Sequence, residues 1–221
     1  LNSNIIVAKQ STEETMDYIK KTIKENLSNK LFFNDDFNYS INENDFFYYE
    51  DQFGGLKLSK PNVLGQFQLE NVSTAIATLR TLNLSIKDEH IKRGILKINS
   101  LARLQEIKSG KLKKLVKNNK LLIDGSHNEN GSYALNKYLQ SLDCKKHVII
   151  GMMANKEHEK YLSYFKDISS ITTIDLKTQP NSISGKKLKD KCKNIPNVQY
   201  QPSIEQAINS IDLKEGDLLL I

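Results

Sequence analysis

The sequence predicts an α/β protein whose second half holds a mostly parallel β-sheet with helices on both faces. From residue 120 onward, short apolar runs alternate with longer amphipathic stretches, which is the pattern of strand–helix–strand units. The chain of 221 residues is long enough to bury a core without disulfide bonds. Its 10 Gly, 4 Pro and 2 Cys exclude collagen-like chains and disulfide scaffolds.

The first part of the chain begins with a strand, a helix and a small β region. The run from Ile5 to Ala8 is short and apolar, which suits a buried strand. Ser11 and Glu14 form a capping box, so we expect a helix from there to about Glu25. Between residues 31 and 58, aromatic and polar residues mix and are interrupted by Asn, Asp and Gly, which predicts short antiparallel strands.

The remaining elements follow from the same apolar spacing. Helices are expected at 69–82 and 86–98, a connector at 99–103, strands at 120–124, 147–153, 171–176, 198–200 and 217–221, and further helices at 130–142, 157–165, 184–192 and 204–211. The chain starts almost directly with a strand and ends inside one. We therefore expect it to be a piece of something longer.

The charge pattern argues against a nucleic-acid partner. The formal net charge of +6 comes from 32 Lys and Arg against 26 Asp and Glu. Nearly all of the basic residues are lysines spread along the chain, whereas nucleic-acid readers commonly cluster arginine with aromatic residues. A Lys-rich solvated surface is the simpler interpretation. No apolar run is long enough to span a membrane, so no membrane partner is expected either.

The cysteines and histidines give no sign of a metal site. Cys144 and Cys192 are far apart and belong to no CxxC motif, which fits two ordinary thiols in the reducing cytoplasm. The four histidines show no metal-ligand spacing with one another or with the cysteines. We therefore predict a cytoplasmic protein with no metal ligands among these residues.

Candidate site residues follow the strands, because ligands of open α/β sheets bind beyond the carboxyl ends. The densest polar group is Asp124-Gly-Ser-His-Asn128. Asp124 can accept from a ribose hydroxyl or hold a cation, and His127 can exchange a proton with a phosphate or carboxylate. A loop ending in a helix N-cap explains this group equally well. At 151–156 and 177–182, a simple turn or loop is at least as good an interpretation as a site.

No phosphate-binding loop is present in the sequence. The pairs Gly110-Lys111 and Gly185-Lys186 lack the upstream glycine of a Walker A loop, and no GxGxxG occurs. If this protein uses ATP, that loop lies outside these residues.

Three segments occur in a suggestive order: Gly65-Gln-Phe-Gln-x-x-Asn71, Leu101-Ala-Arg-Leu-Gln105 and Leu122-Ile-Asp-Gly-Ser-His-Asn128. Together they resemble the carboxyl-terminal half of the folylpolyglutamate synthase/dihydrofolate synthase family, within the Mur ligase superfamily. The resemblance implies the end of a P-loop ATPase central domain over residues 1–99. It further implies a linker at 100–103 and a Rossmann-like C-terminal Mur ligase domain over 104–221.

The resemblance also implies an ATP-dependent, amide-forming ligase of folate biosynthesis and polyglutamylation. ATP would phosphorylate a carboxylate of dihydropteroate or a folate, and the amino group of L-glutamate would attack the acyl phosphate. Mg²⁺ would offset the phosphate charge. We expect a monomer with these small molecules as its partners.

By their place in the motifs, four residues resemble the family's nucleotide and catalytic residues. Asn71 matches an asparagine that contacts adenine, and its amide can both donate and accept. Arg103 matches an arginine that reaches the ATP phosphates as the domains close. Asp124 matches the acid that binds the ribose. His127, the catalytic candidate, matches the histidine near the γ-phosphate and the incoming glutamate.

Two residues depart from the family pattern. Ala102 stands where Gly usually precedes the connector arginine, and Glu129 stands where Pro commonly follows His-Asn. The resemblance also implies that the P-loop, the Mg²⁺ ligands and a carbamylated lysine lie before Leu1, and that the last strand continues beyond Ile221. These 221 residues alone are therefore expected to be inactive.

Two other functions stay open at this point. A UDP-muramyl peptide ligase of cell-wall synthesis would share Asp124, His127 and Asn128, and substrate-dependent release of ADP would separate it from a folate enzyme. A Rossmann-like binding module without catalysis would instead explain the basic surface. A salt-dependent shift on DNA would favour that module.

Overall fold

The computed structural model describes residues 3–23, 30–82, 84–192 and 195–221, which form two compact units. The first unit spans Leu1–Asn99 and the second spans Ser100–Ile221. The expected linker at 100–103 is grouped with the second unit. Within the described ranges, no helix is both long and apolar enough to cross a membrane.

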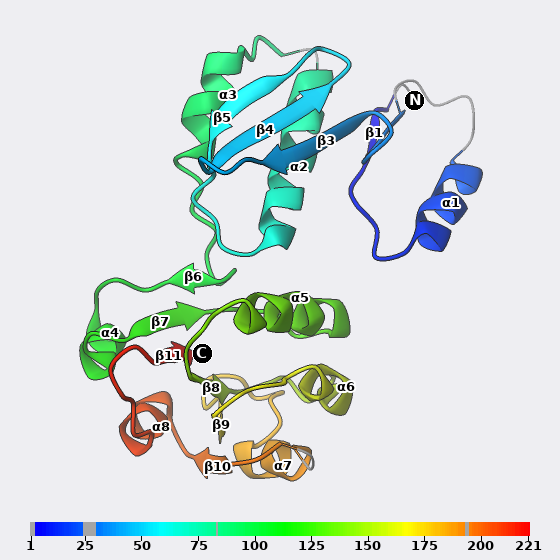
Figure 1. Ribbon diagram of the computed structural model, residues 1–221. Helices are drawn as coiled ribbons and strands as arrows, with labels where there is room; N and C mark the ends of the chain where they lie inside the picture. The colour runs from blue at the N-terminus through cyan, green and yellow to red at the C-terminus, as the bar shows by residue number, and fades with distance from the viewer. Residues whose placement is uncertain (1–2, 24–29, 83, 193–194) are drawn as a thin grey trace. The chain divides into compact units, whose positions relative to one another are not determined.

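The described part of the first unit contains a small parallel sheet, an antiparallel sheet and three helices (Figure 1). Its elements are β1 (Ile5–Val7), α1 (Glu13–Thr22), β2 (Lys30–Phe32), β3 (Phe37–Ile41), β4 (Phe46–Asp51), β5 (Leu56–Ser59), α2 (Gln66–Thr81) and α3 (Asp88–Ile95). Strands β3, β4 and β5 form the expected antiparallel meander. By contrast, β2 pairs in parallel with β1, so the β region is not entirely antiparallel as predicted.

The helix boundaries of the first unit differ from the predicted ones. The N-cap of α1 is Thr12, not Ser11, and its hydroxyl accepts from the Thr15 backbone N–H at 3.2 Å. Ser and Thr can both cap a helix, so the sequence alone did not decide which of these two neighbouring residues is the N-cap. The predicted end near Glu25 lies outside the described residues. Helix α2 begins earlier than expected, and α3 is shorter than the predicted helix at 86–98.

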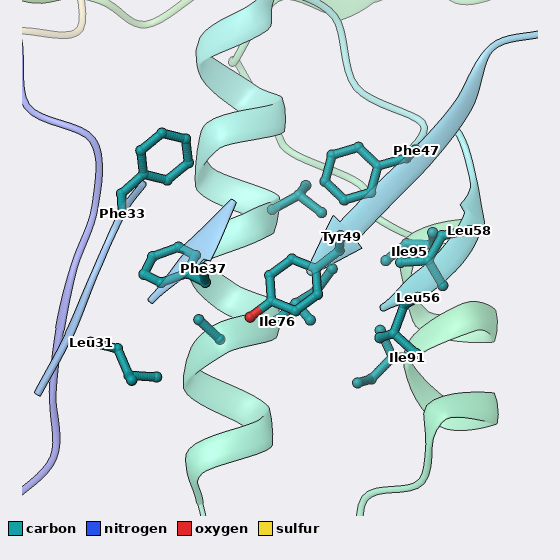
Figure 2. Close-up of a cluster of buried hydrophobic side chains, with 12 residues drawn as sticks. Leu31, Phe33, Phe37, Phe47, Tyr49, Leu56, Leu58, Ile76, Ile91 and Ile95 are labelled. Atoms are coloured by element: carbon teal, nitrogen blue, oxygen red, sulfur yellow. The ribbon is translucent and has the colours of Figure 1, made fainter. Parts of the chain in front are cut away.

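Apolar side chains from the sheets and from two helices form the core of the first unit. Figure 2 shows Ile76 of α2, with Ile91 and Ile95 of α3, gathered around strand residues. Phe47 and Tyr49 reach this core from β4, because alternate residues of a strand face the same side of the sheet.

A buried ion pair lies beside this core. The Arg80 guanidinium of α2 donates to Asp51 Oδ1 at 2.9 Å, and the Tyr49 hydroxyl donates to Asp51 Oδ2 at 2.9 Å. The Asp51 side chain is fully buried and that of Arg80 is 11% exposed. Arg80 also donates to the carbonyls of Phe53 and Gly54. Burial, with the carboxylate as hydrogen-bond partner, raises the pKa of Tyr49.

The second unit is a six-stranded sheet with helices on both faces. Its elements are β6 (Gln105–Glu106), α4 (Lys111–Val116), β7 (Lys120–Ile123), α5 (Glu129–Gln140), β8 (Lys146–Ile150), α6 (His158–Ser163), β9 (Ser170–Ile174), α7 (Gly185–Asp190), β10 (Val198–Gln201), α8 (Ile204–Ser210) and β11 (Leu218–Leu220). The strand order is β10-β9-β8-β11-β7-β6. Only the short β6 is antiparallel among the described pairs, so the predicted mostly parallel sheet is confirmed.

The two faces of this sheet carry different helices. Helices α4 and α8 pack together with strand residues in one core cluster, which includes Val116, Leu121, Ile149, Ile208 and Leu219. Figure 1 shows α5, α6 and α7 on the opposite side. Both faces are therefore apolar, which explains why the strands are continuous apolar runs rather than alternating patterns.

Candidate active site

A pocket of about 470 Å³ lies at the carboxyl ends of the parallel strands of the second unit. Its inner wall is apolar and is built from residues of β8, β9 and β11 together with helix residues. Polar lining comes from two loops. Asp124, Ser126 and His127 follow β7, and Lys156 follows β8. The topology thus places the predicted Asp124–Asn128 loop where open α/β sheets bind ligands.

The Asp124 carboxylate ties the connector to the loop after β7. Its Oδ2 accepts from the Leu104 backbone N–H at 2.8 Å, and its Oδ1 accepts from the Ser126 backbone N–H at 2.8 Å. A carboxylate offers about four acceptor positions, so roughly two remain after these bonds. Asp124 is therefore held in place and still able to accept from the hydroxyls of a ligand.

Arg103 lies in the connector between two anchored residues. The Gly125 N–H donates to the Ala102 carbonyl at 2.7 Å, and Leu104 is bound to Asp124. Ala102 and Leu104 both have φ of 50°, in the left-handed region that favours glycine. This conformation gives a physical reason for a glycine at position 102. The Arg103 side chain itself is exposed.

His127 is held in one tautomer by its own loop. The ring Nδ1 lies 3.0 Å from the Gly125 carbonyl oxygen. A carbonyl can only accept, so Nδ1 carries a proton and, in the neutral ring, Nε2 carries the lone pair. Among the described residues, no hydrogen bond reaches Nε2. Because the side chain is exposed, this nitrogen is available to a ligand.

The two interpretations of the Asp124–Asn128 loop apply to different residues. The Asn128 side chain is the N-cap of α5, since its Oδ1 accepts from the Gly131 N–H at 2.8 Å. Asp124 and His127 take no part in that cap. The loop therefore contains a structural cap and, before it, two side chains with unused atoms.

The turn that carries Lys156 is held by contacts with the loop after β9. Met153 pairs with Ser182 in an isolated antiparallel bridge, and the Ala154 N–H donates to the Asn181 carbonyl at 2.8 Å. Lys156 is half-buried, and in the part of the chain that the structure describes its ammonium makes no ion pair. The sequence left a site and a simple turn as alternatives for residues 151–156, and it assigned no role to Lys156. The signals in the sequence were Gly151 at the strand end and a cation, Lys156, a few residues after it.

The structure brings Asp124 and His127 together in one pocket lining, and the residues on either side of Arg103 are bonded to Asp124 and Gly125. Asn71 belongs to the first unit instead. It lies exposed on α2, and its amide Nδ2 donates to Gln68 Oε1 at 3.2 Å. The amide therefore keeps its carbonyl oxygen for a further donor.

No metal cluster was predicted within the chain. Among the described residues, no group of three or more His, Cys, Asp or Glu side chains could hold a metal ion. Cys192 is buried, and burial raises the pKa of its thiol to about 11, so it remains an un-ionised thiol near neutral pH.

Comparison with known proteins identifies the second unit. A family model described as the Mur ligase, glutamate ligase domain, matches residues 110–221. No curated protein matches the chain in sequence.

Solved structures share the fold of nearly the whole chain. E. coli FolC in complex with ADP is 22% identical, with a TM-score of 0.78, and the match covers 97% of this chain and 49% of FolC. Folylpolyglutamate synthase of Thermotoga maritima is 18% identical, with a TM-score of 0.75, covering 99% of this chain and 52% of that enzyme.

A bifunctional folylpolyglutamate synthase/dihydrofolate synthase, solved with Mn, AMPPNP and L-glutamate, is 20% identical. Its TM-score is 0.70, and the match covers 87% of this chain and 44% of that one. At such identities the likeness establishes a common fold. The chain spans about half the length of the structures that it matches.

Proposed function

The chain belongs to the Mur ligase family, and from this premise we propose that it is part of an ATP-dependent ligase that adds L-glutamate to dihydropteroate, to folates, or to both. In this proposal, residues 1–99 are the end of the central ATPase domain and residues 104–221 are the glutamate ligase domain. The likeness in fold to folate enzymes across both units favours the folate branch over cell-wall ligases.

One observation carries the proposal: Asp124, His127 and Lys156 line the same pocket at the carboxyl edge of the sheet. One bound molecule can thus reach three groups: a carboxylate that accepts hydrogen bonds from hydroxyls, a nitrogen base and a cation. These are the groups needed to bind a nucleotide ribose, an attacking amine and a carboxylate, respectively.

For the nucleotide, Asp124 would accept from the ribose hydroxyls with the acceptor positions that its backbone bonds leave open. Arg103, a permanently charged and planar donor, would reach the phosphates. Asn71 would contact the adenine, because an amide can both donate to and accept from that base edge.

For bond formation, the carboxylate oxygen of the acceptor substrate attacks the γ-phosphorus of ATP, and ADP leaves. The glutamate amine then attacks the acyl carbon, and inorganic phosphate leaves as the amide forms. His127 Nε2 would take up the proton that the amine loses. Lys156 would pair with a carboxylate of the incoming glutamate. Such positioning converts an encounter of two substrates into a reaction within one complex.

ATP is used by such enzymes as a complex with Mg²⁺, which neutralises phosphate charge. The described residues of this chain lack a cluster of metal-ligating side chains. We therefore assign no step to the ion, and we expect its ligands mainly in the part of the enzyme that precedes this chain.

The test is an assay of the complete protein from which this chain comes. We expect release of ADP that depends on both L-glutamate and dihydropteroate or a folate. ADP release with UDP-muramyl substrates alone would instead assign the protein to cell-wall synthesis. No ADP release with either, together with a salt-dependent shift on DNA, would overturn the enzymatic proposal.

A further inference from the structure

Helix α6 contacts both loops that contribute polar side chains to the pocket. Near its middle, Tyr161 lies with its hydroxyl 3.0 Å from Ser126 Oγ, in the loop after β7. At its first residue, His158 Nε2 lies 2.9 Å from the Met153 carbonyl oxygen, in the turn after β8. The two contacted residues are close in sequence to the candidate groups, since Ser126 directly precedes His127 and Met153 comes three residues before Lys156.

Both α6 side chains are buried, so these bonds are not incidental surface contacts. Tyr161 is 4% exposed and His158 is 6% exposed. Burial raises the pKa of Tyr161 to about 12, so its hydroxyl keeps its proton at neutral pH. The Met153 carbonyl can only accept, so His158 must carry a proton on Nε2.

The loop after β7 is also confined from the other side. A Cβ added at Gly131 would lie 2.8 Å from Ser126 Cβ, so Ser126 packs directly against the first turn of α5. The Ser132 hydroxyl of α5 in turn donates to the Tyr161 carbonyl. Ser126 is thus held between α5 and Tyr161, and α5 is fastened to α6.

We propose that α6 is the element that fixes the spacing between His127 and Lys156. Tyr161 acts as a positioning residue for the His127 loop, and His158 acts as one for the Lys156 turn. This inference rests on the proposed function, in which the two groups act on the amine and a carboxylate of one glutamate. The length of the acidic amino acid that the pocket accepts is then set by α6.

The first experiment tests the Tyr161 contact in the complete protein. Tyr161→Phe keeps the ring and removes the hydroxyl. We expect kcat to fall roughly tenfold while KM for glutamate changes less than about twofold. The ring resonance of His127 in a histidine-labelled sample should also move. Ser126→Ala removes the other partner with little change in packing, and it gives an independent result if Tyr161→Phe folds poorly.

Tyr164→Phe is the matched control, because Tyr164 caps the same helix but donates to exposed Glu129 at 2.7 Å. It should change neither kinetic parameter nor the His127 resonance. The double variant Tyr161→Phe/Ser126→Ala should be no worse than either single variant, because both remove one bond. Additive losses, or a His127 resonance that Tyr161→Phe leaves unmoved, would overturn the Tyr161 role.

The second experiment tests the contact between His158 and the turn that carries Lys156. His158→Ala should raise KM for glutamate roughly tenfold with little change in kcat, and His158→Gln, which restores a donor, should recover much of it. Equal losses in both parameters, without recovery, would contradict a positioning role. If the complete protein does not ligate glutamate, the proposed function fails. The His127 resonance and the Lys156 backbone amide resonance still test α6 by themselves.

Discussion

The two units use their charged side chains in different ways. In the first unit, both Asp51 oxygens and the Arg80 guanidinium are engaged with protein partners beside the core. In the second unit, Asp124 is anchored but retains acceptor positions, and His127 is fixed through one nitrogen only. Asp51 and Arg80 are thus bound to protein partners, whereas Asp124 and His127 keep atoms that a ligand can reach.

The largest effect on stability is expected from Arg80→Ala. The substitution leaves the Asp51 carboxylate buried without its cation, which should lower the free energy of unfolding by about 3 to 5 kcal/mol. Urea titration followed by circular dichroism measures this loss. Lys92→Ala removes an exposed ion pair with Glu89 on α3 and should leave the transition unchanged. A similar loss in both variants would mean that the Arg80 pair is not special.

A pH dependence is expected from Tyr161 in the second unit. Its pKa is raised to about 12, so between pH 10 and 12 the folded state holds a proton that the unfolded state has lost. Stability must therefore fall as pH rises through this window, by about 2 to 3 kcal/mol in total for this group. In urea titrations at pH 9 and pH 11.5, the advantage of the wild type over Tyr161→Phe should shrink or reverse. A constant difference would contradict the burial argument.

Asp124→Ala tests a residue with a structural role and a proposed binding role. The Leu104 and Ser126 amides lose their acceptor, which should lower the free energy of unfolding by about 2 kcal/mol. In the complete protein, ATP binding measured by calorimetry should be lost as well. A variant that binds ATP normally would limit Asp124 to its structural role.

Replacing Ala by Gly should have opposite effects on the free energy of unfolding at one position in each unit. At Ala102, with φ of 50°, glycine relieves a left-handed conformation and should raise the free energy of unfolding by up to about 1 kcal/mol. At exposed Ala75, inside α2, it should lower the free energy of unfolding by about 1 kcal/mol. Thermal unfolding curves decide both, and a loss at position 102 would show that its backbone is unstrained.

Arg103→Ala should affect stability least, which makes it the counterpart of Arg80→Ala. The Arg103 side chain is exposed and only its neighbours' backbone groups are bound, so the unfolding transition should stay within experimental error. ATP affinity of the complete protein should fall roughly tenfold or more. Unchanged ATP binding would remove Arg103 from the proposed site.

Much of the second unit could be predicted because its strands are apolar runs separated by helices. Helix α4 was not predicted, since its short, Lys-rich sequence has too little apolar periodicity and its start is marked only by Gly110 with φ of 103°. Strand β6 was not predicted either. It has only two residues, and it forms because residues 105–107 run antiparallel alongside β7 and hydrogen-bond to it.

The candidate site was predictable in part for a similar reason. A cluster such as Asp124–Asn128 after a strand can be recognised locally, and Asn128 could be named as a possible cap. The left-handed backbone at Leu104 could not be foreseen, because leucine rarely adopts it. The contact of Tyr161 with Ser126 joins residues 35 positions apart, and no local pattern indicates such a pair.

The place of β11 in the sheet has a consequence for synthesis on the ribosome. Strand β11 (Leu218–Leu220) pairs with β7 on one side and with β8 on the other. Strands β7 and β8 therefore do not pair with each other. Until β11 leaves the exit tunnel, two half-sheets expose apolar edges. The sheet must therefore close after β11 has been translated, and the nascent chain is open to chaperones and aggregation until then.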